Sequence, residues 1–335
     1  MPDYGKPLEF GFFPEPLADP PERVERLVRA AERSGLDLIG IQDHPYQHRF
    51  YDTWTLISYL AARTERVRSF PDVANLPLRP PAMLAKAAAS LDVLTRGRVE
   101  IGLGAGAFWD AIEAMGAPRR SPAEAVRSVE EAIKVMRLVW SEERSLRFDG
   151  ESYKLAGMRP GPRPARPIGI WLGVGGPRML KLTGRLADGW VPSLGWAPPG
   201  RLQELHERID EGALEAGRRP EEIKRLYNVS GMIGPEGEGL LEGSASKWTE
   251  HLPLRAGERD GHVHLLALWR PRAAGRDFWP GGGPRGKGCR RKGACAAIEL
   301  RPTALCPGGL GPCSLIACLA LSCQVVRYPS SPYRA

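Results

Sequence analysis

The segment that decides the fold of this chain is residues 97–106, Gly-Arg-Val-Glu-Ile-Gly-Leu-Gly-Ala-Gly. Within it, Arg98–Leu103 has the short apolar pattern of a buried strand, and closely spaced glycines follow directly. An Ala-rich helical stretch, 81–94, precedes the strand. After the strand, Ser121-Pro122-Ala123-Glu124 combines a capping box with proline at the first helical position, which predicts the start of a helix. A strand between two helices is the repeating unit of a parallel α/β sheet.

The same alternation of short apolar runs and amphipathic stretches covers the first 230 residues. Seven strands are predicted, and each except the last is followed by a helix. The predicted strands are 8–13, 36–41, 70–76, 98–103, 168–172, 190–193 and 225–232. A polar insertion over 141–167, with a turn at Asp149-Gly150, separates the fourth unit from the fifth. Because an open doubly wound sheet has fewer units, the pattern favours a (β/α)8 barrel, or TIM barrel, that lacks a visible eighth strand.

The composition divides the chain at about residue 252. The 335 residues carry a net charge of +8, with 42% hydrophobic and 26% charged residues, which suits one large core. Residues 253–335 contain 13 Lys and Arg against 4 Asp and Glu, a net charge of +9, so residues 1–252 carry −1. The six cysteines also lie in this tail: Cys289, Cys295, Cys306, Cys313, Cys318 and Cys323. A disulfide or zinc framework in the first 288 residues is therefore excluded, and no metal site is expected.

Toward the C-terminus the periodicity stops, and the sequence becomes rich in Gly, Pro, Arg and Cys, a composition typical of disorder. A natural flexible tail is one interpretation, but it leaves the barrel one strand and one helix short, with two open sheet edges. The alternative is a frameshift between Leu252 and Glu258. Displaced by one base, codons for Arg259–Ala267 can encode Gly-Met-Asp-Thr-Phe-Ile-Phe-Trp-Pro, a good buried strand. We therefore expect an incomplete barrel domain, 1–252, and a basic, disordered, out-of-frame tail, 253–335.

Four motifs that follow predicted strands indicate the kind of barrel. They are Gly40-Ile41-Gln42-Asp43-His44, Asn75-Leu76-Pro77-Leu78-Arg79-Pro80-Pro81, the 97–106 segment, and Trp171-Leu172-Gly173-Val174-Gly175-Gly176-Pro177-Arg178. Each lies at the carboxyl end of its strand, where barrel enzymes keep their active sites. With the four motifs in this order, residues 8–251 resemble the luciferase-like monooxygenase family of flavin- or coenzyme F420-dependent oxidoreductases. The resemblance implies a (β/α)8 flavoprotein that holds FMN or the deazaflavin coenzyme F420.

Asp43 and His44 come directly after the second predicted strand, so both side chains are expected at the barrel mouth. An imidazole there can relay a proton to a reduced flavin or a substrate, which makes His44 the candidate catalytic residue. The resemblance implies that the pair touches the cofactor ring, with Asp43 as a cofactor-binding residue. It also implies a non-proline cis peptide behind the ring at Val73, Ala74 and Asn75. The alternative for Asp43 and His44 is a capping aspartate beside a solvated histidine.

Glycines after the fourth and fifth strands are further candidate cofactor-binding positions. By resemblance, Gly104 and Gly106 lie beside the cofactor, although a tight turn alone also explains glycine there. Gly173, Gly175 and Gly176 precede a helix with proline in its first turn. The free N–H groups at such a helix start can bind an anionic cofactor tail.

These expectations converge on an oxidoreductase that transfers hydride between F420 or FMN and a small organic substrate, by monooxygenation, dehydrogenation or reduction. The motifs look closer to the deazaflavin branch. One alternative is an inactive or cofactor-free barrel that serves as a partner subunit, or a frame-broken product without activity. Another is nucleic-acid binding by the basic tail, which lacks the interleaved aromatics of a single-strand binder. A cytoplasmic protein without a membrane or specific nucleic-acid partner is expected, and a homodimer is left open.

Overall fold

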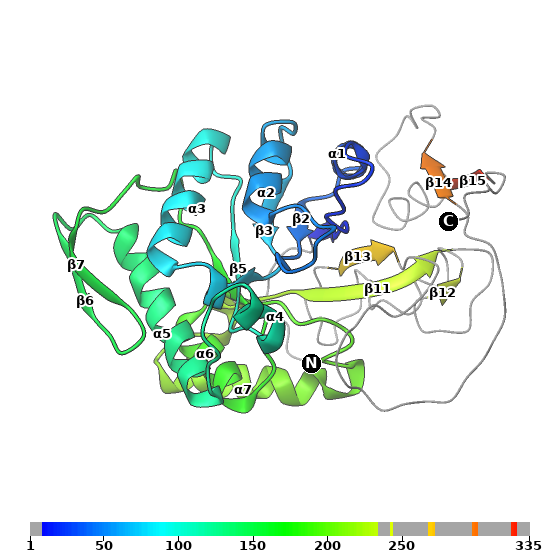
Figure 1. Ribbon diagram of the computed structural model, residues 1–335. Coiled ribbons are helices and arrows are strands. Elements are labelled where there is room, and N and C mark those ends of the chain that lie inside the picture. The colour runs from blue at the N-terminus through cyan, green and yellow to red at the C-terminus, as the bar shows by residue number, and fades with distance from the viewer. Residues whose placement is uncertain (1–8, 234–241, 244–266, 272–296, 301–322, 327–335) are drawn as a thin grey trace. The chain divides into compact units, whose positions relative to one another are not determined.

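The computed structural model describes residues 9–233 and four short segments beyond them, 242–243, 267–271, 297–300 and 323–326 (Figure 1). The chain divides into two units. The first comprises residues 1–230 with 257–270, and the second comprises residues 231–256 with 271–335. The boundary expected at residue 252 stays a prediction.

The second unit is described only through short strands. In it, β12 (Glu242–Gly243) pairs in parallel with the end of β11 (Tyr227–Ile233). A separate antiparallel pair is formed by β14 (Ala297–Leu300) and β15 (Cys323–Val326). The rest of the predicted tail lies outside the described residues.

Parallel strands form a closed ring in the first unit. In chain order they are β1 (Phe10–Phe12), β2 (Leu38–Ile41), β3 (Arg68–Pro71), β4 (Ala74–Asn75), β5 (Ile101–Gly104), β8 (Ile170–Leu172), β9 (Gly189–Trp190), β10 (Lys224–Arg225), β11 and β13 (Ala267–Pro271). One arc has the order β11-β13-β1-β2-β3, and the other has the order β4-β5-β8-β9-β10. Parallel bridges from Ser69 to Val99 and from Ser193 to Asn228 join the two arcs. The predicted barrel is therefore confirmed in the part of the chain that the structure describes.

The position of the eighth strand is filled by β13, which corrects the expectation that this strand is missing. β13 is parallel to β1, with Ala267–Trp269 opposite Phe10–Phe12. The sequence argument set this segment aside because it lies in the basic tail. Its short Ala-Leu-Trp run is nevertheless enough to pair with an edge whose N–H and C=O groups would otherwise lack partners. The expected loss of the last helix concerns a part of the chain outside the described residues.

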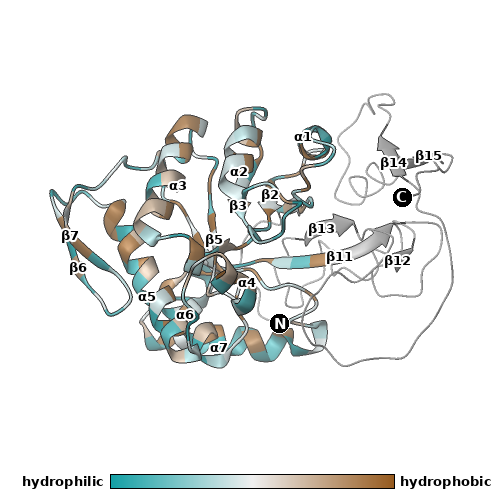
Figure 2. Ribbon diagram, in the orientation of Figure 1, coloured by the Kyte–Doolittle hydropathy of each residue, from teal (hydrophilic) through white to brown (hydrophobic). Residues whose placement is uncertain are grey.

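Helices alternate with the barrel strands and lie outside the ring (Figure 1). They are α1 (Arg23–Arg33), α2 (Thr53–Ala61), α3 (Pro81–Thr95), α4 (Trp109–Ala114), α5 (Pro122–Val139), α6 (Pro177–Leu186) and α7 (Leu202–Glu215), with 3-10 turns η1 (Leu76–Leu78), η2 (Pro199–Arg201) and η3 (Pro220–Glu222). The capping box at Ser121 and Glu124 is confirmed. Apolar and polar residues alternate along α5, α6 and α7 (Figure 2), as helices that cover a barrel require.

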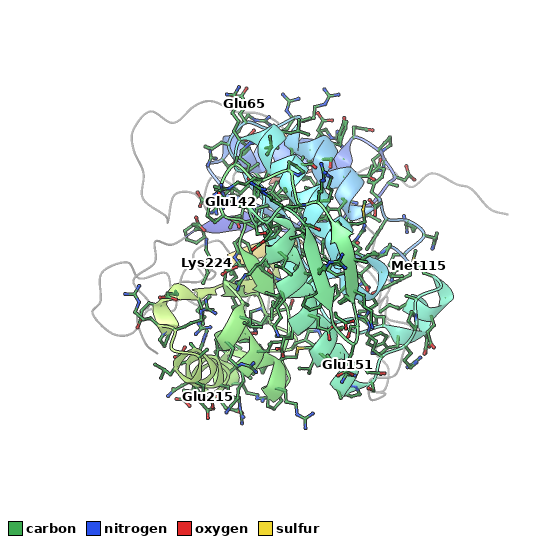
Figure 3. All side chains as sticks on the ribbon, turned by 90° about the vertical axis from the view of Figure 1, so that its left-hand side faces the viewer. Glu65, Met115, Glu142, Glu151, Glu215 and Lys224 are labelled. Carbon is green, nitrogen blue, oxygen red and sulfur yellow. The ribbon has the colours of Figure 1, made fainter. Side chains whose placement is uncertain are left out.

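The polar insertion contains the expected hairpin. Its strands are β6 (Leu146–Asp149) and β7 (Lys154–Met158), which pair antiparallel. The turn is held by Glu131 of α5, whose carboxylate accepts the backbone N–H groups of Glu151, Ser152 and Tyr153. Glu151 of this turn is exposed at the periphery of the molecule (Figure 3), and its carboxylate pairs with Arg127 on the outer surface of α5 at 2.9 Å. The insertion is thus attached to the outside of the barrel and does not enter its interior.

The barrel interior is packed with side chains and is not a pore. A buried cluster combines residues of several strands and strand ends: Phe13, Leu38, Phe70, Trp171, Val191 and Leu226. Within it, the rings of Phe70 and Trp171 meet edge to face, with centroids 4.9 Å apart. Val73 packs against the same cluster. This core fixes the strand ends on which the candidate site is built.

Candidate active site at the barrel mouth

The candidate site residues lie at one end of the barrel. Asp43 and His44 follow β2, Asn75 ends β4, Gly104 ends β5, and Gly173 follows β8. Since these strands are parallel, their carboxyl ends meet at the same rim. The structure therefore brings together residues that are far apart in the sequence.

Asp43 is the centre of a buried ion-pair network. Its side chain has no exposed surface and accepts the Asn75 N–H at 2.9 Å, Arg79 Nε at 2.6 Å and Arg79 Nη2 at 2.7 Å. Arg79 also binds Asp52 at 2.6 Å, and Asp52 caps α2 by accepting the Thr55 N–H. Burial lowers the pKa of Arg79, but the bonds to Asp43 and Asp52 outweigh it and raise the pKa. Asp43 and Arg79 thus hold together two segments of the mouth, the one after β2 and the one after β4.

Arg79 is a residue of the candidate site that the sequence argument did not single out. It lies inside one of the four quoted motifs, so its place in the sequence was visible. Its role could not be predicted, because no local sequence pattern pairs an arginine with an aspartate 36 positions earlier. That Asp43 binds a cofactor remains a prediction, since the described contacts of its carboxylate are to Arg79 and Asn75.

His44 is part of an aromatic group at the mouth. Its Nδ1 lies 2.8 Å from the Tyr46 hydroxyl, and its ring centroid lies 5.5 Å from that of Phe108. Tyr46 and Phe108 also meet, at 6.0 Å. Burial, and then the negative charge of Asp43, raise the pKa of Tyr46, so its hydroxyl keeps its proton at neutral pH. The hydroxyl and the imidazole can share one hydrogen bond in either direction, which sets the ring nitrogen that carries the proton.

The segment between β3 and β4 begins with a non-proline cis peptide, Asp72–Val73. It lies at the start of the Val73-Ala74-Asn75 segment for which the family resemblance implies such a bond. A Cβ added at Gly104 would lie 2.7 Å from Val73 Cγ2, and one added at Gly173 would lie 2.8 Å from Val73 Cγ1. Both glycines are therefore needed where the Val73 side chain approaches the neighbouring strand ends.

We expect Gly104→Ala to destabilise the mouth, because the new methyl group overlaps Val73 and overpacking typically costs about 1–3 kcal/mol. The matched test introduces Gly104→Ala into the Val73→Ala variant, which lacks the overlapping methyl groups, so that the same change is expected to cost little there. Chemical denaturation measures the cost of Gly104→Ala in each background. An equal cost in both backgrounds would show that Val73 is not the reason for glycine at position 104.

The remaining glycines have different surroundings. Gly106 has a φ of +97°, and a Cβ there would lie 2.8 Å from Pro77 Cγ, so both the turn and the packing require glycine. A Cβ at Gly175 or Gly176 would meet nothing within 4 Å. Gly176 is the N-cap of α6, no side chain caps that helix, and Pro177 follows. This open helix start is suited to an anionic group.

Four buried polar atoms near the strand ends lack a hydrogen-bond partner among the described residues: Gln42 Nε2, Asp72 Oδ2, Asn75 Oδ1 and Asn228 Oδ1. The parent residues follow β2 and β3, end β4, and lie in β11. Buried polar atoms without partners are rare in folded proteins and are characteristic of sites completed by a ligand or by water. This donor and acceptor set fits a polar, planar cofactor.

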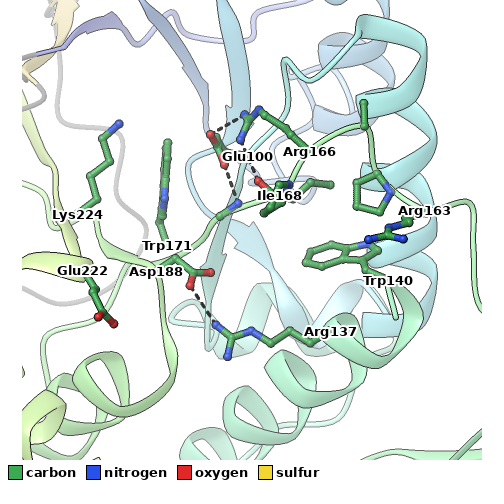
Figure 4. A pocket seen from close by; sticks show the side chains of 14 residues that line it. Glu100, Arg137, Trp140, Arg163, Arg166, Ile168, Trp171, Asp188, Glu222 and Lys224 are labelled. Carbon is green, nitrogen blue, oxygen red and sulfur yellow. Dashed lines mark hydrogen bonds and ion pairs between the residues drawn. The ribbon is translucent and has the colours of Figure 1, made fainter. Parts of the chain in front are cut away.

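The opposite end of the barrel has a cleft of about 670 Å³ (Figure 4). It lies at the amino ends of β5, β8, β9 and β10. Four of its charged side chains form two pairs: Glu100 binds Arg166 at 2.6 Å, and Asp188 binds Arg137 at 3.1 Å. These two pairs act as supports at this end of the barrel.

Among the described residues, no group of three or more His, Cys, Asp or Glu side chains is arranged to hold a metal ion. The described helices include none that is both long and apolar enough to cross a membrane.

A closed barrel with its unpaired polar atoms, its glycines and a histidine at the carboxyl ends of the strands has the architecture of a barrel enzyme with a small-molecule site. The model of the family described as luciferase-like monooxygenase matches residues 7–275. The chain belongs to this family of F420- and flavin-dependent oxidoreductases. The resemblance drawn from the four motifs is thereby confirmed.

Relatives similar in sequence agree with this assignment. An F420-dependent glucose-6-phosphate dehydrogenase of Intrasporangium calvum is 34% identical over 63% of this chain and 65% of its own length. That of Nakamurella multipartita is 30% identical over 79% of this chain and 78% of its own length. The chain thus spans about two thirds to three quarters of these relatives.

Among solved structures, an F420-dependent secondary alcohol dehydrogenase superposes with a TM-score of 0.70 at 19% identity, covering 79% of this chain and 93% of its own. The FMN-bound oxygenating component of a Pseudomonas putida 3,6-diketocamphane monooxygenase superposes with a TM-score of 0.57 at 22% identity, covering 68% of each chain. At these identities the superpositions support the fold alone.

Proposed function

We propose that this protein is a cofactor-dependent oxidoreductase that transfers hydride between coenzyme F420, or FMN, and a small organic substrate. The observation that carries the proposal is the set of buried polar atoms without partners at Gln42, Asp72, Asn75 and Asn228, close to the strand ends that bear His44. The cofactor when bound supplies the hydride acceptor or donor. F420 is favoured over FMN because the related glucose-6-phosphate dehydrogenases are named for it.

The residues of the chain have separate tasks in this proposal. His44 exchanges a proton with the reacting oxygen of the substrate, and Tyr46 orients the imidazole through Nδ1. Phe108 packs against both rings and limits the access of water. Val73 supports the ring of the cofactor, with Ala74, Asn75, Gly104, Gly106 and Gly173 around it. Gly175 and Gly176 at the open start of α6 bind the anionic tail.

The experiment that tests the proposal is a titration of the purified chain with F420 and with FMN, followed by visible absorption. Saturable spectral changes with one cofactor support the function and identify that cofactor. Absence of binding to both would overturn it in favour of an inactive or cofactor-free barrel that acts as a partner subunit. The same samples, sized in solution with and without cofactor, decide whether the chain forms a homodimer. We also propose that the protein is cytoplasmic.

We also propose that residues 1–252 carry the whole cofactor site and that the gene has a one-base frameshift between Leu252 and Glu258. The basic charge of residues 253–335 and the confinement of all six cysteines to this tail support the proposal. In a frame-corrected chain, the codons of Arg259–Ala267 would encode Gly-Met-Asp-Thr-Phe-Ile-Phe-Trp-Pro, an apolar strand longer than β13. We expect it to unfold at a higher temperature and more cooperatively than the present chain, because a full strand buries more apolar surface. Equal midpoints and equal cooperativity in thermal unfolding would contradict the frameshift.

A further inference from the structure

Asp72 differs from the other buried acidic side chains of the described residues, which are Asp43, Asp92, Glu100 and Glu131. Each of those four accepts three hydrogen bonds from arginine or backbone N–H donors. Asp72 is 7% exposed and accepts one, from Asn228 Nδ2 to Oδ1 at 3.0 Å. Its Oδ2 has no partner. A buried carboxyl group with half of its hydrogen-bonding capacity unused requires an explanation.

The position of Asp72 places this unused capacity at the mouth. The residue follows β3 directly, whereas Asn228 lies in β11, which is not a neighbour of β3 in the sheet. The Asp72 to Asn228 hydrogen bond therefore spans the barrel interior just beyond the apolar core. Val73, the next residue, is the side chain that Gly104 and Gly173 accommodate. Asp72 thus lies beside the segment proposed to support the cofactor ring.

The pKa of Asp72 lies close to neutral pH. Burial raises the pKa of Asp72 to about 7, against a smaller opposing effect of the Asn228 hydrogen bond. The titratable groups of the elements around it are otherwise engaged. On the β2 side, Asp43 is paired with Arg79; on β11, burial raises the pKa of Tyr227 to about 12, so Tyr227 stays neutral. β5 contributes no titratable side chain between Ile101 and Gly104.

We propose that Asp72, as the neutral acid, donates a hydrogen bond from Oδ2 to a carbonyl oxygen of the cofactor ring, so that cofactor binding requires one proton on Asp72. The inference rests on the proposed function. A protonated carboxyl group needs an acceptor, and the neighbouring Asn228 Oδ1, also without a partner, needs a donor. Flavin and deazaflavin rings carry a carbonyl group next to a ring N–H and so present both along one edge. A ligand with only apolar contacts would leave both oxygens unsatisfied.

The test compares cofactor affinity at about pH 6 and about pH 8.5 in the wild-type chain and in Asp72→Asn, with F420 and FMN as probes. As the pH rises between these two values, the cofactor affinity of the wild type is expected to fall about 30-fold more than that of Asp72→Asn, because Asp72 loses its proton. Asp72→Asn keeps an N–H donor and is expected to bind almost equally well at both values. The ionisation of the free cofactor is common to both proteins. The control is Asp149→Asn, which changes an exposed carboxylate of the hairpin. Its cofactor affinity should depend on pH as in the wild type.

A second measurement needs no variant. Calorimetric titration of the wild-type chain with the cofactor at about pH 7.5, in buffers with different ionisation enthalpies, should show uptake of about 0.8 proton more than the free cofactor's ionisation accounts for. No such uptake, or the same pH profile in Asp72→Asn and wild type, overturns the role of Asp72 while leaving the proposed function intact. If neither cofactor binds to either protein at any pH, both the function and this inference fail.

Discussion

Replacing Arg79 by methionine is expected to lower the free energy of unfolding by about 3–5 kcal/mol, because it leaves the carboxylate of Asp43 buried without its counter-ion. The side chain of Asp43 has no exposed surface, so water cannot replace the two bonds that Arg79 donates at 2.6 and 2.7 Å. Denaturant unfolding of the full chain measures the loss. This is the largest stability effect that we expect from a single change at the mouth.

Two comparisons make this result specific. The double variant Arg79→Met with Asp43→Asn removes both charges and should be more stable than Arg79→Met alone, because no charge remains buried. Arg119→Met breaks the exposed pairs of Arg119 with Asp110 and Glu113 and should leave unfolding almost unchanged. If Arg79→Met unfolds like Arg119→Met, the Asp43 network does not hold the mouth together.

Replacing His44 by alanine is expected to lower the single-turnover rate of hydride transfer by about 10²–10⁴-fold, the usual contribution of a general acid or base. Cofactor affinity should stay within a few-fold of the wild type, because the buried polar atoms and the start of α6 remain intact. Tyr46→Phe removes the hydroxyl bound to Nδ1 and should have a smaller effect on rate, together with a shifted pH profile. Stopped-flow absorption of the bound cofactor measures each rate with a substrate that the wild type turns over.

The matched control for His44 is His48→Ala, because His48 lies exposed on the same loop. It should react at the wild-type rate. Single-turnover rates that are equal in His44→Ala and His48→Ala would return His44 to the alternative of a solvated loop histidine. A parallel loss of cofactor affinity in His44→Ala would indicate a binding role and not a proton-transfer role.

Much of the site could be predicted from the chain order, and the limits have physical causes. Since Asp43 and His44 follow one strand and Gly104 ends another, a parallel barrel necessarily gathers them at one rim. The glycine at 104 was recognisable as a close approach, but the approaching group was not. That group is Val73, which only the folded chain brings within 2.7 Å of the Cβ position. A glycine in the sequence indicates that another group comes close to the backbone, but it does not identify that group.

By itself, the sequence determined the barrel, the capping box at Ser121 and the family, because strand and helix periodicities and local caps depend on near neighbours along the chain. Only the tertiary structure decided which contacts cross the molecule. β13 pairs with β1 although its sequence surroundings argued against a strand. Asp72 meets Asn228 across 156 positions, and Asp43 meets Arg79 across 36. The closure of the barrel decides which residues meet a buried charge, and the spacing of residues along the chain does not predict these partners.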